Sequence, residues 1–309
     1  MVSGARPAKA GRASFIMNTF TIRDIQNMSG IKAHTLRVWE QRYGLIMPKR
    51  KESKHRFYDN DDLKQILRVA YLYRNGYKIS RIASFSSDEI QRLALQIEHQ
   101  GSPYESYINQ LIESSMDFNE LEFDRLMDKL ILNLGFEVSM LNVVYPLLEK
   151  IGLLWMTSNV IPAQEHFISQ IIRRRILVAT NQLPKLTSRD NRKIVIFAPK
   201  GEMHELPLLF VQYQLKKHGI PSVYFGTHRA CTTIGDYLLR HRATHIYFHL
   251  ITYLSDCDLD TYLRQLCEAF PEQKIVVSGK IAAGVDFTAD NLRILKSLEE
   301  AMAFSKGEI

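Results

Sequence analysis

Apolar residues at helical spacing predict two short helices near the start of the chain. They cover residues 22–28 and 32–42, and Thr21 is suited to cap the first of them. Gly30 lies in the turn between the two helices, and Gly44 ends the second. Two short helices joined by a turn that contains glycine are typical of a helix-turn-helix.

The next segment, residues 47–58, has no helical period and contains five Lys or Arg residues. We expect a small β-hairpin here, which would form a wing beside the two helices. Helical spacing then resumes up to Gly76, and a fourth helix takes Ile79, Ile82 and Ala83.

Residues 100–185 contain amphipathic segments and few strand signals, so we expect a four-helix bundle. The predicted helices cover residues 104–115, 119–134, 137–154 and 164–183.

From residue 192 onward, short apolar runs alternate with amphipathic segments. This alternation predicts an open, doubly wound parallel sheet, with ligands beyond the carboxyl ends of its strands. The five predicted strands cover residues 193–198, 222–225, 245–250, 274–278 and 292–295. The predicted fold class is α plus α/β multidomain, with a disordered leader at 1–17, a winged helix-turn-helix at 18–98, a four-helix bundle at 99–188 and a doubly wound domain at 189–309.

The net charge of +7 is concentrated near the start of the chain. Residues 1–16 carry +3, residues 17–78 carry +7 and the remainder carries −3. A localised basic segment indicates a polyanionic partner, although charge alone does not separate DNA from RNA or an anionic membrane.

Several other classes of protein are not favoured. No apolar run approaches 18 residues, so we expect no membrane span. The three cysteines, Cys231, Cys257 and Cys267, lack CxxC spacing, which favours a reducing, cytoplasmic compartment and argues against structural zinc. The leader is rich in Arg and Ser like a transit peptide, but we interpret it as a disordered extension or an upstream start codon.

The second predicted helix presents side chains suited to reading base edges in a major groove. The wing supplies cations for phosphates on the flank, which position a protein without reading sequence. The candidate base contacts are His34, Thr35, Arg37 and Gln41, and the candidate phosphate contacts are Lys49, Arg50, Lys51, Lys54 and Arg56.

These residues fall within motifs that resemble a MerR-type DNA-binding domain. The motifs are Thr21-Ile22-Arg23-Asp24-Ile25, Ser29-Gly30-Ile31, Thr35-Leu36-Arg37-Val38-Trp39-Glu40, Arg42-Tyr43-Gly44-Leu45 and Arg56-Phe57-Tyr58, over about 75 residues. The resemblance implies that Arg37, Arg42, Arg56 and Tyr58 lie at the DNA.

A second candidate site follows the first predicted strand of the sheet, at Glu202-Met203-His204. A neutral histidine can coordinate a transition metal, and a carboxylate two residues earlier can accept its other ring N–H and fix the tautomer. A zinc hydrolase is not indicated, because HExxH spacing is absent.

The order of head, bundle and sheet domain resembles the CarH family of light-responsive, cobalamin-dependent regulators. The resemblance implies that His204 is the lower ligand of cobalt, paired with Glu202. It also implies that Trp155, Glu165 and His166 cover the upper face and the adenosyl group, and that Thr252, Leu254, Ser278 and Gly279 contact the nucleotide tail. Three positions depart from the family pattern: Pro207 replaces a glycine, Ser278 replaces the first glycine of a pair, and Met156 replaces the histidine after the tryptophan.

We therefore expect a sequence-specific transcriptional regulator that is controlled by cobalamin, with adenosylcobalamin favoured, and by light. Its expected partners are a DNA operator, copies of itself in a dimer or tetramer, and RNA polymerase. In the alternative, the sheet domain has lost its cofactor and serves oligomerisation or partner binding. A cobalamin-dependent enzyme is not favoured, because no barrel-length β/α repeat is present.

Overall fold

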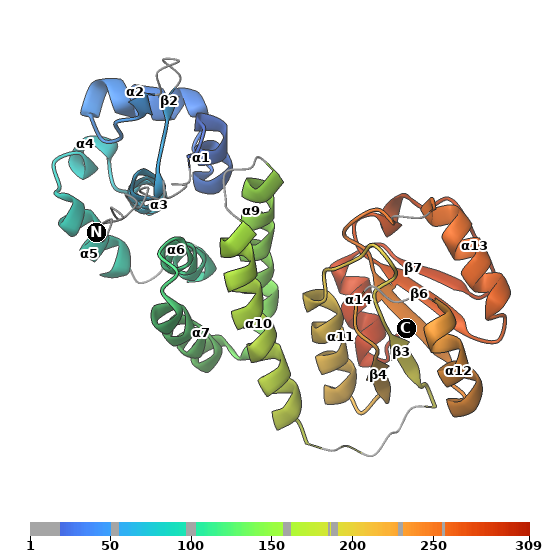
Figure 1. The fold of residues 1–309 in the computed structure, drawn as a ribbon. Coiled ribbons are helices and arrows are strands. Elements are labelled where there is room, and N and C mark those ends of the chain that lie inside the picture. Colours follow the sequence, from blue (N-terminus) through green and yellow to red (C-terminus); the bar gives the residue numbers. More distant parts are fainter. Residues whose placement is uncertain are drawn as a thin grey trace, which may run out of the picture. The chain divides into compact units, whose positions relative to one another are not determined.

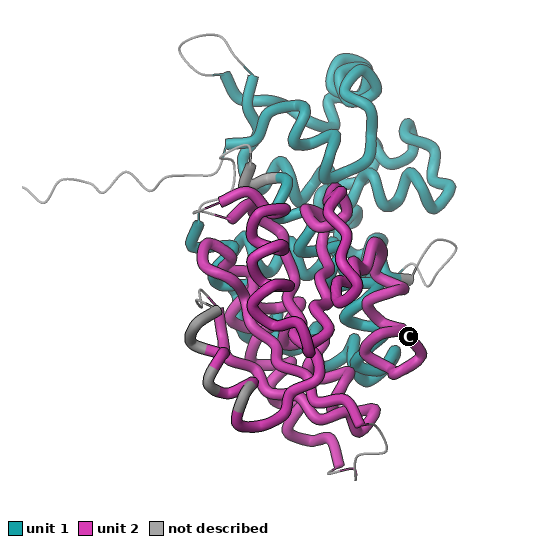
Figure 2. The backbone as a smooth tube through the Cα atoms, turned by 90° about the vertical axis from the view of Figure 1, so that its right-hand side faces the viewer, with its two compact units in different colours: residues 1–168 teal, residues 169–309 magenta. Residues whose placement is uncertain are grey.

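The computed structural model describes residues 19–50, 56–96, 103–156, 162–184, 186, 191–227, 231–254 and 257–309 of the chain. The chain divides into two compact units, residues 1–168 and 169–309 (Figure 2). Within the described residues, no helix is both long and apolar enough to cross a membrane.

The first unit begins with the predicted helix-turn-helix. Helix α1 (Ile22–Ser29) starts with a capping box between Thr21 and Asp24, and it ends at Gly30, whose φ of 68° favours glycine. Helix α2 (Ala33–Tyr43) follows. Strands β1 (Lys49–Arg50) and β2 (Arg56–Phe57) pair antiparallel, as expected for a wing.

Three helices complete the head (Figure 1). They are α3 (Asn60–Arg74), α4 (Ile79–Ile82) and α5 (Ser87–Gln96). Helix α5 was not predicted as a separate element. It begins with an N-terminal Ser-x-x-Glu capping box, in which Ser86 and Glu89 bond to each other's backbone.

The bundle helices occur close to the predicted positions. They are α6 (Pro103–Met116), α7 (Glu120–Leu134), α8 (Phe136–Ser139), α9 (Tyr145–Met156) and α10 (Pro162–Gln182). The single helix expected over 137–154 is instead interrupted by a π-helical turn at Met140–Val144. Such a turn inserts one residue into the helical repeat, which periodicity alone does not reveal.

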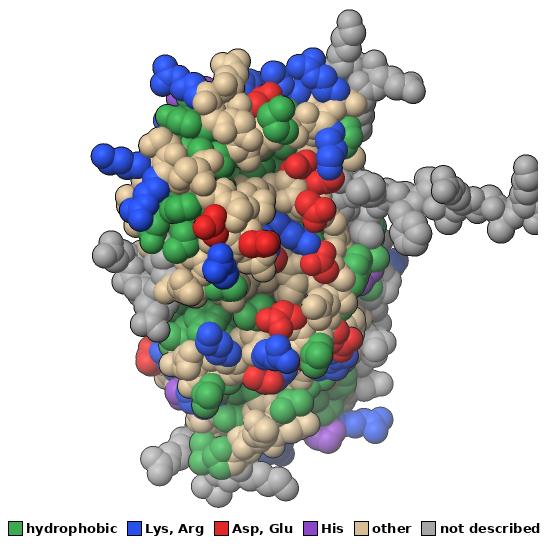
Figure 3. Space-filling model, turned by 90° about the vertical axis from the view of Figure 1, so that its left-hand side faces the viewer, with side chains coloured by type: hydrophobic (Ala, Val, Ile, Leu, Met, Phe, Trp, Pro, Cys, Tyr) green, Lys and Arg blue, Asp and Glu red, His purple; other side chains and the backbone are tan. Residues whose placement is uncertain are grey.

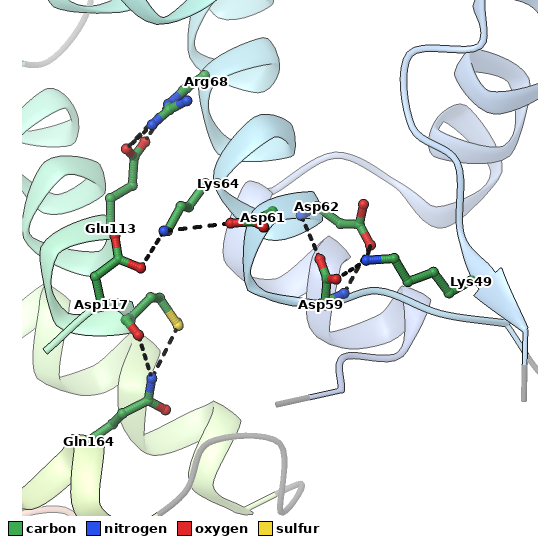
Figure 4. Close-up of polar contacts among 10 residues, drawn as sticks. Lys49, Asp59, Asp61, Asp62, Lys64, Arg68, Glu113, Asp117 and Gln164 are labelled. Carbon is green, nitrogen blue, oxygen red and sulfur yellow. Dashed lines mark hydrogen bonds and ion pairs between the residues drawn. The ribbon is translucent and has the colours of Figure 1, made fainter. Parts of the chain in front are cut away.

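Cations of α3 pair with carboxylates on α6 or directly after its last residue, and we call this contact the α3–α6 joint. Arg68 binds Glu113 through two nitrogens, with a closest N–O distance of 2.6 Å, and Lys64 Nζ lies 2.5 Å from Asp117 (Figure 4). A third pair joins Arg74 to Glu105. The three pairs occur one after another along α3 and in the reverse order along α6, as expected for antiparallel helices. They therefore hold the head against the bundle at three points.

The second unit contains a five-stranded parallel sheet in the order β4-β3-β5-β6-β7. The strands are β3 (Ile194–Ile196), β4 (Ser222–Tyr224), β5 (His245–His249), β6 (Lys274–Ser278) and β7 (Leu292–Leu295). This order places the first point of strand reversal between β3 and β5, where doubly wound folds bind ligands.

Helices cover both faces of the sheet (Figure 1). They are α11 (Leu206–Lys217), α12 (Cys231–His241), α13 (Leu259–Ala269) and α14 (Leu298–Lys306). The core beneath α12 and α13 includes Val195, Phe197 and Phe248. The buried residues of β3, β5 and β6 explain why the sequence shows continuous apolar runs in these strands rather than alternation.

Candidate functional site

Helix α2 presents most of the predicted base contacts to solvent. His34, Arg37, Gln41 and Arg42 are exposed, and Thr35 is half-buried. The opposite face of α2 is fixed by Leu36 and by Trp39, whose ring meets Tyr73 of α3 edge to face at 5.1 Å. Lys and Arg side chains gather at the upper end of this unit (Figure 3).

The wing places two arginines opposite each other. Arg50 of β1 pairs in register with Arg56 of β2, and both side chains are exposed. Like charges directly across a strand pair destabilise it, so this hairpin is suited to an anion that lies between them. Arg56 also lies 3.4 Å from Glu40, and Lys49 bonds to Asp59. The predicted contacts Lys51 and Lys54 lie outside the described residues.

Tyr58 does not lie at the surface as the resemblance implied. Its side chain is 2% exposed, and its backbone pairs with that of Phe20. Burial, followed by the nearby carboxylate of Glu40, raises the pKa of its hydroxyl. In this structure Tyr58 therefore packs within the head, because the wing strand leads directly into the core.

The second candidate site lies at the carboxyl ends of β3 and β5. The Glu202 side chain is fully buried, and its Oε1 accepts bonds from the His204 backbone at 2.8 Å and from the His204 ring Nδ1 at 2.7 Å. Its Oε2 accepts from the backbone N–H groups of Ile251 at 2.7 Å and Thr252 at 2.9 Å, and from the Thr252 hydroxyl at 3.2 Å. We call these four residues the His204 corner.

The protonation states of the His204 corner follow from these bonds. Burial on its own raises the pKa of Glu202, but the bonds from His204, Thr252 and Ile251 outweigh burial and lower it to about 2. A carboxylate only accepts, so Nδ1 of His204 carries the proton, and in the neutral ring Nε2 carries the lone pair. The His204 side chain is 45% exposed. The corner can thus offer one imidazole nitrogen as a metal ligand.

A second polar chain lies beside this corner. The Ser278 hydroxyl lies 2.6 Å from the Tyr247 hydroxyl and 2.8 Å from Nδ1 of His249. Burial, with smaller opposed effects of Glu202 and His204, lowers the pKa of His249 to about 4. The hydroxyl of Ser278, which departs from the family glycine, therefore connects the buried Tyr247 to the half-buried His249.

The remaining predicted cofactor contacts of the second unit lie near the same edge. Gly279 has a φ of 106°, and a Cβ at this position would lie 2.2 Å from the Leu250 carbonyl oxygen, so only glycine fits. Leu254 packs against the core beneath α12 and α13. Pro207 occupies the first turn of α11, where its missing N–H costs little.

The predicted upper-face residues Trp155, Glu165 and His166 belong to the first unit. Trp155 stands in the last turn of α9. In the first turn of α10, the His166 ring Nδ1 lies 3.5 Å from Glu165, and His166 is exposed. Their participation in one site with His204 stays a prediction.

Sequence reasoning missed His249, Arg173 and Glu205 near the predicted ligand. His249 is the last residue of β5 and the last but one of the predicted strand, so its position near a carboxyl strand end was a usable signal. Arg173 lies within a run of three arginines on a helix, and nothing in that run distinguishes it.

Two protein families match successive parts of the chain. Residues 20–94 match the MerR HTH family of regulatory proteins. Residues 107–179 match the B12 binding domain family, which covers helices of the bundle. The protein is thus a MerR-type DNA-binding regulator with a B12-binding domain.

Two curated relatives are similar over much of the chain. The HTH-type transcriptional repressor CarH of Myxococcus xanthus is 23% identical over 271 residues, which cover 86% of this chain and 90% of CarH. The repressor CarA of the same organism is 28% identical over 203 residues, which cover 65% of this chain and 66% of CarA.

One solved structure shares the fold of about two thirds of the chain. The monomethylamine corrinoid protein of Methanosarcina barkeri superimposes with a TM-score of 0.52 and 12% identity, over 66% of this chain and 98% of that protein. Together these matches do not favour the alternative in which the sheet domain has lost its cofactor.

Proposed function

We propose that this protein is a cytoplasmic, non-catalytic regulator that binds an operator and is controlled by cobalamin, with His204 as the lower ligand of cobalt. One observation carries the cobalamin assignment. The Nδ1 of His204 bonds at 2.7 Å to a fully buried carboxylate, which leaves the lone pair on Nε2. This pair lies beyond the carboxyl end of β3, next to the strand reversal.

The residues of the corner fit cobalamin better than a metal ion bound by protein alone. Among the described residues, no group of three or more His, Cys, Asp or Glu side chains is arranged to hold a metal. When bound, cobalamin supplies a cobalt ion already held by four ring nitrogens and, in its adenosyl form, a light-sensitive cobalt–carbon bond. A single well-oriented imidazole suffices as the protein's lower ligand, and Glu202 fixes its orientation.

Further cofactor contacts are assigned by resemblance to the CarH family. They are Trp155, Glu165 and His166 for the upper face, and Thr252, Leu254, Ser278 and Gly279 for the nucleotide tail. Met156 replaces the histidine that follows the tryptophan in light-responsive members, and a thioether is a poorer ligand than imidazole. The effect of light therefore has to be measured by comparing the loaded protein in darkness and after illumination.

The DNA-binding half of the proposal rests on the exposed face of α2 and on the wing. In this proposal Arg37 reaches base edges, while Arg50 and Arg56 meet phosphates. Two copies of the head would recognise a repeated or palindromic operator. The cofactor can change operator binding only if it binds the separate and the associated forms of the protein with unequal affinity. Light acts on the same balance by changing the bound cofactor.

The cofactor is tested by purifying the full chain with hydroxocobalamin or adenosylcobalamin and recording its visible spectrum. We expect a coloured protein, and we expect His204→Ala to lose the spectrum of histidine-bound cobalt. His218→Ala, which changes an exposed histidine at the far end of α11, is the matched control and should keep that spectrum. A protein that stays colourless with both cofactors would remove the cobalamin assignment and support an oligomerisation role.

Operator binding is tested by selection from a pool of random duplexes, followed by titration against salt. With 6–10 phosphate contacts, affinity should fall about 10³–10⁵-fold between 50 and 200 mM salt. Arg37→Ala should cost about 1–3 kcal/mol and relax the preference at one base pair, whereas Arg50→Ala should weaken all duplexes alike. Sequence preference unaffected by Arg37→Ala would contradict the proposed role of α2. Light scattering in darkness and after green illumination tests the association of copies.

A further inference from the structure

His204 lies between two carboxylates that are anchored to different parts of the second unit. Glu202, two residues before it, is bonded to the loop after β5. Glu205, the residue after it, occupies the N-cap position of α11 but makes no capping bond with its side chain. The Glu205 carboxylate is therefore used for something other than the start of its own helix.

Both oxygens of Glu205 are bound by residues of other elements. Oε1 accepts from Nε of Arg173 on α10 at 2.6 Å, and Oε2 accepts from the hydroxyl of Tyr224 on β4 at 3.2 Å. The loop that carries His204 is thus fixed on one side by Glu202 and on the other by Glu205.

The ion pair contributes little to stability by itself. Arg173 and Glu205 are 38% and 26% exposed, and ion pairs at such positions are typically worth less than about 1 kcal/mol. The ion pair matters more for geometry than for stability. It restrains the backbone at Glu205, next to His204, whose ring must point in one direction to bind cobalt. Residues that orient a metal ligand affect affinity more than stability.

We propose that Arg173 is a positioning residue for His204 and acts through Glu205, with Tyr224 as the second anchor. The inference deepens the proposed function and rests on it, because His204 is the proposed cobalt ligand. It assigns to α10 a direct influence on the lower ligand, since Arg173 stands on that helix.

The chain offers a matched control for this assignment. Lys216 Nζ donates to the Thr180 carbonyl oxygen at 2.7 Å, and this bond joins the same two helices, α10 and α11. It lies near the opposite end of α11 from Glu205. Lys216→Gln therefore weakens the packing of α10 on α11 without touching the His204 loop.

The experiment compares Arg173→Gln, Arg173→Lys, Tyr224→Phe and Lys216→Gln in the full chain. Hydroxocobalamin affinity is measured by titration. After reduction to the cobalt(II) form, protein labelled with 15N-histidine reports whether His204 is bound. A 15N ligand splits the electron paramagnetic resonance lines into doublets, whereas the cofactor's own 14N base gives triplets. We expect Arg173→Gln to weaken affinity about 10-fold and to lower the histidine-bound fraction. Arg173→Lys should recover part of both, because lysine keeps the charge without the fixed geometry of arginine.

Hydrogen exchange of residues 199–206 in the cofactor-free protein gives an independent result. Arg173→Gln should accelerate exchange there, and Lys216→Gln should not. Failure of the parent protein to bind any cobalamin would remove the proposed function, and the exchange comparison would still test the anchor. Equal effects of Arg173→Gln and Lys216→Gln on affinity, spectrum and exchange would overturn the positioning role.

Discussion

The α3–α6 joint and the His204 corner both use carboxylates to hold a functional element, but they do so by different physical means. In the joint, long cationic side chains reach across two helices, and each carboxylate meets a single cation such as Arg68 or Lys64. In the corner, one fully buried carboxylate, Glu202, accepts from two backbone segments and a ring nitrogen.

This difference separates adjustable contacts from fixed ones. Ion pairs near the surface are weakened by salt and by competing water, so the joint can be adjusted at low cost. Replacing a buried carboxylate that accepts from several N–H donors costs much free energy, because those donors are left without partners. The head is thus attached by contacts that can be tuned, and the proposed ligand is held by contacts that cannot.

The comparison predicts its largest effect at Glu202. In Glu202→Gln, the amide nitrogen must face N–H donors that the carboxylate now satisfies. We expect the second unit to lose about 3–5 kcal/mol. Hydrogen exchange in β3 and β5 measures this change, and Glu202→Asp, which keeps the charge, should recover part of it. A loss below about 0.5 kcal/mol would show that the corner is no more rigid than the joint.

The next effect is the pH dependence of the second unit through His249. Burial lowers the pKa of His249 to about 4, below its ordinary value of 6.5. Between these values the unfolded chain binds more protons than the folded one, so stability falls as pH falls through this window. The loss approaches about 3 kcal/mol near pH 4.

The measurement is the free energy of unfolding of the second unit at pH values from 7 to 4. It is made for the parent protein and for His249→Asn, whose amide can still bond to Ser278. The difference between the two curves isolates His249 from the other acidic groups. Equal slopes across this window would mean that His249 titrates as an ordinary histidine.

The sequence predicted the regular elements of both regions well, because burial patterns are local. Strands β6 and β7 occur at the predicted residues, since short, mainly apolar segments mark them. The spacing of Glu202 and His204 likewise made their pairing predictable. Partners far apart in the sequence were not predictable: the bonds from Ile251 to Glu202 and from Arg173 to Glu205 depend on which strands and helices become neighbours.

Two expectations differ from the arrangement in the structure. Tyr58 was expected at the DNA from the family resemblance alone, whereas it is 2% exposed and its backbone pairs with that of Phe20, so its role at the DNA stays a prediction. The π-helical turn at Met140–Val144 leaves the apolar pattern nearly unchanged, so the pattern predicted one uninterrupted helix. The predicted domain boundaries and site residues stay predictions that the variants described above address.

A smaller effect is expected at the joint. Arg68 is 17% exposed and binds Glu113 through two nitrogens across helices. Arg68→Gln should therefore destabilise the contact between α3 and α6 by about 1–2 kcal/mol, because Glu113 loses a charged partner in a half-buried position. Hydrogen exchange in α3 and α6 measures the change at 50 mM and 1 M salt. The difference between parent and variant should shrink at high salt, and a difference that grows would contradict an ion-pair joint.

The smallest effect is expected for the same substitution on the neighbouring helix. Arg125 of α7 pairs with Glu122 three residues away at 3.1 Å, and Arg125 is 69% exposed. The pair closes no contact between elements and is largely solvated, so Arg125→Gln should change local stability by no more than about 0.5 kcal/mol. Both variants remove one arginine from one arginine–glutamate pair, and only the setting differs. An Arg125 effect as large as that of Arg68 would mean that net charge, rather than the geometry of the joint, holds the first unit together.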